Sequence, residues 1–229
     1  MTPLVLIPGM MCDARMWGGF TAAHRPLIHA LPTGHDTVQA LASEILRDAP
    51  PHFALAGLSM GGIVAMEIVA QASSRVERLA LLDTNPCAET PEAQARRAPQ
   101  IAKALAGGLE AVLREEMKPN YLAPGPNQKP ILDLCLKMAL ALGPEIFARQ
   151  SVALRDRPDQ TATLATYKGP TLVLMGAEDR LCPRDRHEQM HALVSQSYFV
   201  IIPGVAHLPP LEAPEITAAH LREWLSIPT

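Results

Sequence analysis

The chain has 229 residues, of which 48% are hydrophobic and 19% are charged, and this composition indicates a globular protein rather than a disordered one. The formal net charge is −3 and Lys and Arg are not clustered, which argues against a nucleic-acid partner. No apolar run approaches the roughly 18 residues of a membrane span, and residues 1–9 lack the basic start of a signal peptide. We therefore expect a cytoplasmic protein with one domain, or one domain with an insertion.

Short apolar runs alternate with helical patterns along most of the chain. The expected strands are 4–7, 26–31, 53–57, 78–83, 171–176 and 198–202. The expected helices between and after them are 37–48, 60–73, 184–194 and 214–225. Most of the strands are continuously apolar, which is typical of strands buried on both faces. The alternation predicts an α/β fold with a mostly parallel sheet of about six strands.

Residues 86–160 interrupt this alternation, because no strand pattern occurs among them. Helical patterns at 94–105, 109–117 and 131–142 are separated by prolines and glycines. We interpret this stretch as a helical insertion into a core formed by residues 1–85 and 161–229. It contains ten Lys or Arg and nine Asp or Glu residues, so the count predicts no docking surface of a single charge. Insertions at the carboxyl edge of such sheets often line a site.

The motif G-x-S-x-G at residues 57–61 has Ser59 at its centre and lies between an expected strand and an expected helix. A serine on a tight strand-to-helix turn projects its hydroxyl above the sheet, and the glycines leave room around it. The helix N-terminus below favours developing negative charge. This context predicts that Ser59 is a nucleophile.

A serine hydroxyl needs a base, and the imidazole of that base needs an orienting carboxylate. Asp179 and His207 each follow an expected strand, and the chain order of Ser59, Asp179 and His207 suits a catalytic triad on such a sheet. Asp83 is the rival orienting acid, because it also ends a strand. The backbone N–H groups of Met10 and Met60 are the expected oxyanion donors, and Met11 is expected to contact the substrate.

A second motif, H-E-x-x-H at His187–His191, competes with this interpretation. On a helix the two histidines would share one face and could bind Zn²⁺, with Glu188 as the general base of a peptidase. No H-x-x-G-x-x-H extension follows, and the helix is expected to lie away from the site loops. We expect a solvated helix face and no metal. The four cysteines (Cys12, Cys87, Cys135 and Cys182) are widely spaced and are expected to be free thiols.

Segments 8–13 with Trp17, 57–62, 176–179 and 204–207 together resemble the α/β-hydrolase superfamily, of the small serine esterase type. The resemblance implies a Ser59–His207–Asp179 triad, a helical cap over residues 86–160 and hydrolysis through an acyl-enzyme, without a cofactor. The chain departs from the common pattern at Pro8, where a histidine is frequent, and at residues 205–206. It also lacks the usual first two strands.

The expected function is hydrolysis of small or medium apolar carboxylic esters, with a small-molecule substrate as the partner; the oligomeric state is not predicted. Thioesterase, lactonase and carbon–carbon hydrolase activities would use the same residues. A second hypothesis is a slow-turnover ligand sensor, because the spacing of Gly9, Cys12, Asp13 and Trp17 resembles hydrolase-fold signalling proteins. Sustained turnover would favour the enzyme over the sensor.

Overall fold

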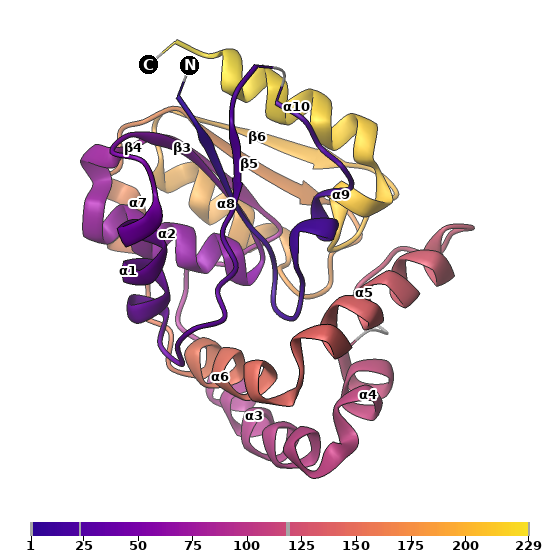
Figure 1. Ribbon diagram of the computed structural model, residues 1–229. Coiled ribbons are helices and arrows are strands. Elements are labelled where there is room, and N and C mark those ends of the chain that lie inside the picture. Colours follow the sequence, from indigo (N-terminus) through magenta and orange to yellow (C-terminus); the bar gives the residue numbers. More distant parts are fainter. Residues whose placement is uncertain (1, 23, 118–119, 229) are drawn as a thin grey trace.

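The computed structural model describes residues 2–22, 24–117 and 120–228, and a parallel six-stranded sheet forms its centre (Figure 1). The strand order is β2-β1-β3-β4-β5-β6, and each pairing is parallel. The strands are β1 (Leu4–Ile7), β2 (Leu27–His29), β3 (Phe53–Leu58), β4 (Val76–Leu82), β5 (Thr171–Gly176) and β6 (Ser197–Ile202). The expected parallel sheet is therefore confirmed. Strand β2 is shorter than the expected 26–31, because it lies at the edge and only three of its residues pair with β1.

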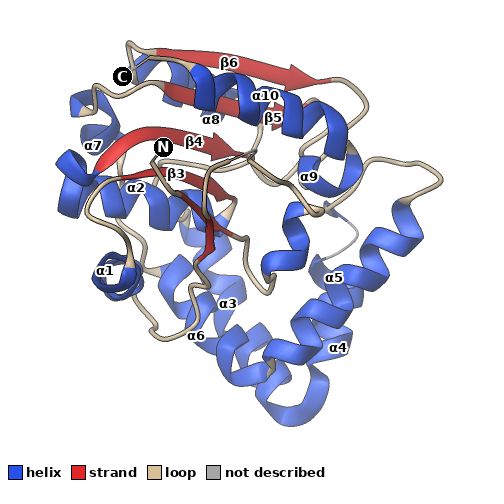
Figure 2. Cartoon of the chain, turned by 45° about the horizontal axis from the view of Figure 1, so that its top comes forward, coloured by secondary structure: helices blue, strands red, loops and turns tan. Residues whose placement is uncertain are grey.

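Helices cover both faces of the sheet (Figure 2). The helices outside the insertion are α1 (Val38–Asp48), α2 (Met60–Ala72), α7 (Thr161–Thr166), α8 (Arg184–Leu193), α9 (Pro209–Glu212) and α10 (Pro214–Ser226), with short 3₁₀ turns at η1 (Ala14–Trp17) and η2 (Ser73–Arg75). In β3, Leu55 packs in the same cluster as α1 and α2, whereas its neighbours Ala54 and Ala56 pack with Trp224 of α10. Burial on both faces explains why the strands are continuously apolar.

All other helices lie between β4 and β5 in the sequence. They are α3 (Pro91–Lys103), η3 (Ala104–Gly108), α4 (Leu109–Ala111), η4 (Val112–Met117), α5 (Gln128–Leu142) and α6 (Pro144–Arg155). Figure 1 shows them grouped at one end of the molecule. Helix α6 lies beyond 131–142, the last helical pattern expected in this stretch, and is not among the expected elements. Pro144 is in fact the first residue of a new helix, a position where its missing N–H group costs nothing.

Buried polar contacts attach the inserted helices to the sheet domain. The side chain of Gln150 in α6 accepts a hydrogen bond from the Met11 N–H (2.8 Å) and donates one to the Pro32 carbonyl (2.9 Å). Glu212 in α9 accepts the Ala123 N–H at 3.0 Å. The insertion is therefore held at defined points rather than only by apolar packing.

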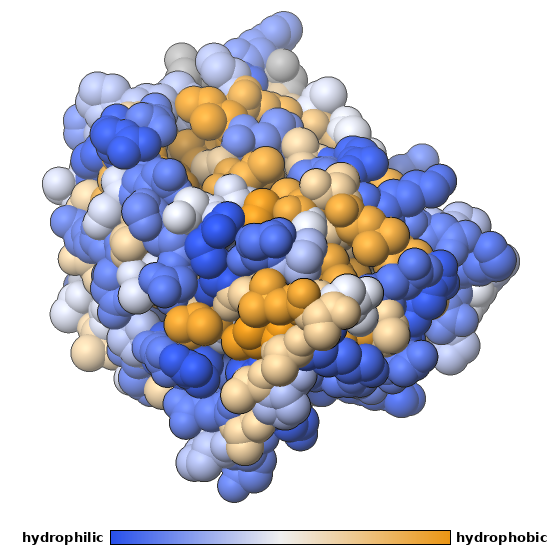
Figure 3. Space-filling model, turned by 60° about the horizontal axis from the view of Figure 1, so that its bottom comes forward, coloured by the Kyte–Doolittle hydropathy of each residue, from blue (hydrophilic) through white to orange (hydrophobic). Residues whose placement is uncertain are grey.

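The surface on the side of the inserted helices is mostly hydrophilic, with apolar patches between the charged side chains (Figure 3). Leu105 and Leu140 are among the exposed apolar residues, with 52% and 45% of their surface accessible. Within the described part of the chain, no helix combines the length and the apolar character required to cross a bilayer.

Candidate active site

Ser59 occupies a strained turn between β3 and α2. Its backbone has φ 54° and ψ −118°, in the region of positive φ that side chains rarely adopt. A Cβ atom at Gly57 would collide with the Gly61 carbonyl, and one at Gly61 would collide with the Ile7 carbonyl. The Thr84 hydroxyl donates a 2.7 Å hydrogen bond to the Ser59 carbonyl. The two motif glycines therefore permit the turn, and the segment after β4 holds it.

The structure brings the three predicted catalytic side chains together. The hydroxyl oxygen of Ser59 lies 3.0 Å from Nε2 of His207, and Nδ1 of His207 lies 2.9 Å from Oδ2 of Asp179. The other oxygen of Asp179 accepts the N–H groups of Leu181 (2.8 Å) and Cys182 (3.2 Å). Because a carboxylate can only accept, Nδ1 of His207 carries the proton and Nε2 is free to accept the hydroxyl proton.

Asp83, the rival acid, lies beside Asp179 instead of beside His207. Its Oδ1 accepts the Gly176 N–H at 2.9 Å, and its buried Oδ2 has no hydrogen-bond partner among the described residues. Burial, together with the negative charge of Asp179, raises the pKa of Asp83 well above its usual range. Burial also works to raise the pKa of Asp179, but His207 and the two N–H groups outweigh it and the pKa is lowered. Burial and the neighbouring charge therefore favour the neutral form of Asp83, and the contacts of Asp179 favour its charged form.

The two predicted oxyanion donors border the same cavity as Ser59. The Met10 N–H has no acceptor among the described residues, and Met60 opens α2, so that its N–H lacks a partner within the helix. Met11 has a different environment: only 2% of it is exposed, and its N–H is bound to Gln150. The prediction that Met11 contacts substrate does not fit this position, because its side chain is packed in the core.

The two histidines of the H-E-x-x-H motif differ in burial and in the groups that they contact. His187 is completely buried, and its Nε2 accepts the Thr84 N–H (3.2 Å) while Nδ1 faces the Pro183 carbonyl (3.2 Å). Burial lowers the pKa of His187 to about 4. His191 is exposed and its Nδ1 contacts the Ser197 hydroxyl. The expectation of a solvated face was therefore wrong for His187, which supports Thr84 and, through it, the turn at Ser59.

Ser59 opens into a cavity of about 870 Å³ between the sheet edge and the inserted helices. Apolar side chains of Met10, Met60, Ile63 and Leu154 form part of its wall. Tyr121, in the segment between η4 and α5, places its ring 6.1 Å from that of His207, and its carbonyl accepts the His207 N–H at 3.0 Å. The sequence offered no signal for Tyr121, because only the packing of the insertion places it there.

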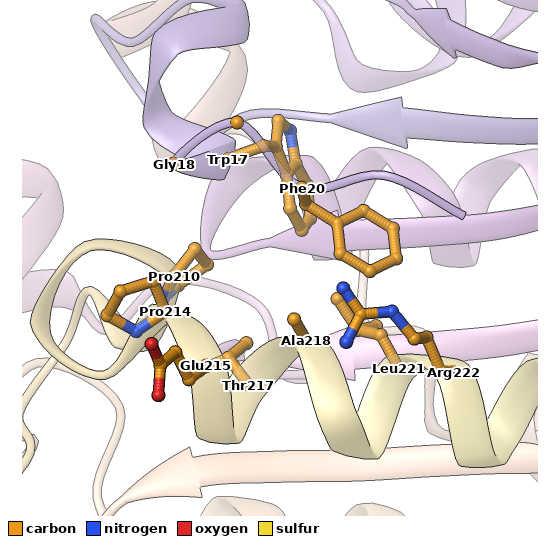
Figure 4. A pocket seen from close by; sticks show the side chains of 11 residues that line it. Trp17, Gly18, Phe20, Pro210, Pro214, Glu215, Thr217, Ala218, Leu221 and Arg222 are labelled. Atoms are coloured by element: carbon orange, nitrogen blue, oxygen red, sulfur yellow. The ribbon is translucent and has the colours of Figure 1, made fainter. Parts of the chain in front are cut away.

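A second cavity, of about 410 Å³, lies between the residues that follow η1 and helix α10 (Figure 4). Trp17 and Phe20 line one side, and the Arg222 guanidinium lies 5.8 Å from the centre of the Phe20 ring. None of Ser59, Asp179 and His207 lines this cavity. Of these three residues, Ser59 lines the larger cavity.

Comparisons with known proteins agree with this geometry. A thermophilic esterase from Thermogutta terrifontis, in a malate-bound structure, is 30% identical with a TM-score of 0.83, covering 98% of this chain and 89% of its own. An enol-lactonase from Burkholderia xenovorans LB400 shares the fold with a TM-score of 0.87 at 20% identity, covering 99% of this chain and 92% of its own. A pimeloyl-[acyl-carrier protein] methyl ester esterase from Aromatoleum aromaticum is 26% identical over 96% of both chains. Residues 4–220 match the sequence profile of the alpha/beta hydrolase family, and the chain therefore belongs to this family.

Proposed function

We propose that this protein is a serine hydrolase that cleaves carboxylic esters through an acyl-enzyme. The observation that carries the proposal is the continuous chain of contacts from the Ser59 hydroxyl through His207 to Asp179, on a strained turn that opens into a large cavity. The names of the relatives from T. terrifontis and A. aromaticum support an ester as the bond that is cleaved.

In the first step, the Ser59 oxygen attacks the ester carbonyl while Nε2 of His207 takes its proton. The charge that develops on the carbonyl oxygen is stabilised by the N–H groups of Met10 and Met60. Asp179 stabilises the resulting imidazolium, which donates its proton to the departing alcohol. Water then attacks the acyl-enzyme, His207 accepts its proton, and the acid is released with Ser59 restored.

Residues 86–160 act in this proposal as a cap over a core formed by residues 1–85 and 161–229. The apolar part of the cavity wall, with Met10, Met60, Ile63 and Leu154, suits an acyl chain of small to medium size. The substrate is a small-molecule ester that the enzyme meets in the cytoplasm, and the reaction requires no cofactor.

The test is steady-state hydrolysis of 4-nitrophenyl hexanoate by the wild-type protein and by Ser59→Ala. Sustained turnover that is lost in Ser59→Ala is the expected result, because no other described residue offers a hydroxyl next to His207. Arg47→Gln, an exposed substitution on α1, is the control and should retain full activity. Activity that persists in Ser59→Ala would refute the proposed mechanism, and a single burst without turnover would favour the ligand sensor.

A further inference from the structure

The cavity that contains Ser59 is lined by cationic side chains, although the whole chain has a net charge of −3. Its lining includes five arginines but only two acidic residues, Glu89 and Glu116. The arginines are Arg96, Arg97, Arg157, Arg180 and Arg186. The nearly equal numbers of acidic and basic residues in the insertion do not predict this excess of arginines. It arises because Arg96, Arg97 and Arg157 line the same cavity as arginines that follow β5.

Both acidic groups are already paired with cations. Glu116 binds Lys103 at 3.0 Å. Glu89 is bound by Arg97 through two contacts, of 2.7 and 3.1 Å, and by Arg157 at 3.0 Å. Only 5% of the Glu89 side chain is exposed, with 16% for Arg97 and 10% for Arg157. One carboxylate between two guanidinium groups leaves one positive charge uncompensated in a partly dehydrated place.

This excess charge lies close to the reaction centre. Among the described residues, the hydrogen-bond acceptor of Arg97 Nη1 is the sulfur of Met10, at 3.7 Å, and sulfur is a weak acceptor. The N–H group of the same Met10 is the proposed oxyanion donor. At the rim, the exposed Arg96 and Arg180 have no ionic partner within the described ranges. Arg97, whose Nη1 has only a weak acceptor among the described residues, therefore lines the same cavity that an acyl chain attached to Ser59 would occupy.

We infer that the preferred substrate is an ester whose acyl chain ends in a carboxylate, bound by Arg97 and Arg157 and attracted by Arg96 and Arg180. The inference rests on the proposed function and narrows its substrate class. The apolar wall accommodates the methylene chain, and the donors that Glu89 leaves unused, such as Nη1 of Arg97, bind the terminal anion through charge-assisted hydrogen bonds. A monoanionic carboxylate is preferred over a phosphate because the buried cluster carries a single excess charge.

The test compares two esters with the same six-carbon acyl chain, mono(4-nitrophenyl) adipate and 4-nitrophenyl hexanoate, which differ only in the terminal group. We expect the wild-type protein to favour the adipate ester in kcat/KM by about 10- to 100-fold, as a charged hydrogen bond in a partly buried place allows. Rising salt should reduce this preference, because ions screen the attraction. A phosphate-terminated ester of similar length should be hydrolysed less well than the adipate ester.

Two sets of substitutions locate the effect. Arg97→Gln should remove most of the preference for the adipate ester, and thermal unfolding by circular dichroism will show whether this variant folds. The exposed pair Arg96→Gln and Arg180→Gln avoids that problem and should reduce the preference by up to about fivefold. The matched control is Arg47→Gln, which removes one positive charge on α1 and should leave the preference unchanged.

The possible outcomes separate the two proposals. Equal kcat/KM for both esters, unaffected by the arginine substitutions, would overturn the inference while Ser59-dependent hydrolysis of the hexanoate still supported the esterase. If neither ester is turned over, the proposed function fails, and calorimetric binding of monomethyl adipate decides the inference. Binding that is weakened by the Arg96 and Arg180 substitutions would support the anion site, and an absence of binding would overturn it.

Discussion

Asp179, which contacts His207, and its buried neighbour Asp83 should respond very differently to the same substitution. In Asp179→Asn, the Leu181 and Cys182 N–H groups will hold the amide oxygen, because only an oxygen can accept them. The amide nitrogen then faces Nδ1 of His207, which must accept instead of donate. The ring proton moves to Nε2, where it blocks acceptance of the Ser59 proton. We expect kcat to fall by about 10⁴-fold, the size of this effect in Ser-His-Asp triads.

In Asp83→Asn, the replacement keeps the hydrogen bond that the native side chain makes. Its amide oxygen can accept the Gly176 N–H, as Oδ1 of Asp83 does at 2.9 Å. Burial and the charge of Asp179 raise the pKa of Asp83 well above its usual range, so the neutral amide resembles the form of the side chain that the site favours. We therefore expect kcat to change by less than about tenfold. This is well below the loss expected in Asp179→Asn, where the ring proton of His207 moves to Nε2.

The assay is steady-state hydrolysis of 4-nitrophenyl hexanoate from pH 5 to 9, with circular dichroism to verify that both variants fold. Asp83→Ala supplies a further comparison, because it leaves the buried Gly176 N–H without an acceptor and should cost about 1–3 kcal/mol of stability. A loss of activity in Asp83→Asn equal to that in Asp179→Asn would refute the reasoning and assign the orienting role to Asp83.

Three further predictions concern the surroundings of the triad. Burial lowers the pKa of His187 to about 4, so the unfolded chain binds a proton before the folded chain does as the pH falls from 6.5 to 4. The free energy of unfolding should therefore drop by on the order of 3 kcal/mol over that range. In urea titrations at pH 7 and 4.5, His187→Asn should abolish this contribution. Glu212 accepts the N–H groups of Ala206 and Leu208, on either side of His207, as well as that of Ala123. Glu212→Gln should therefore lower kcat by about tenfold and the free energy of unfolding by about 1–3 kcal/mol. Unchanged kinetics and an unchanged melting temperature would contradict a positioning role. A chelator should leave ester hydrolysis unchanged, because both ring nitrogens of His187 are hydrogen bonded within the protein; inhibition that added zinc reverses would contradict this prediction.

The sequence by itself determined the elements that position the candidate catalytic residues. The apolar strands, the glycines on both sides of Ser59 and the positions of Asp179 and His207 after strands can be interpreted locally, because strand burial, turn geometry and chain order leave direct patterns in the sequence. The parallel sheet follows from the same patterns. The order of its strands does not, since it depends on which strands pair across long separations.

Only the tertiary structure decided which groups surround the triad. The hydrogen bond between Asp83 and Gly176, the burial of His187 against Thr84 and the fixing of Met11 by Gln150 join residues from 93 to 139 positions apart. Such contacts arise from the packing of whole elements and leave no local pattern. The same holds for the cationic cavity, because a count of charges along the insertion cannot show which side chains converge in space.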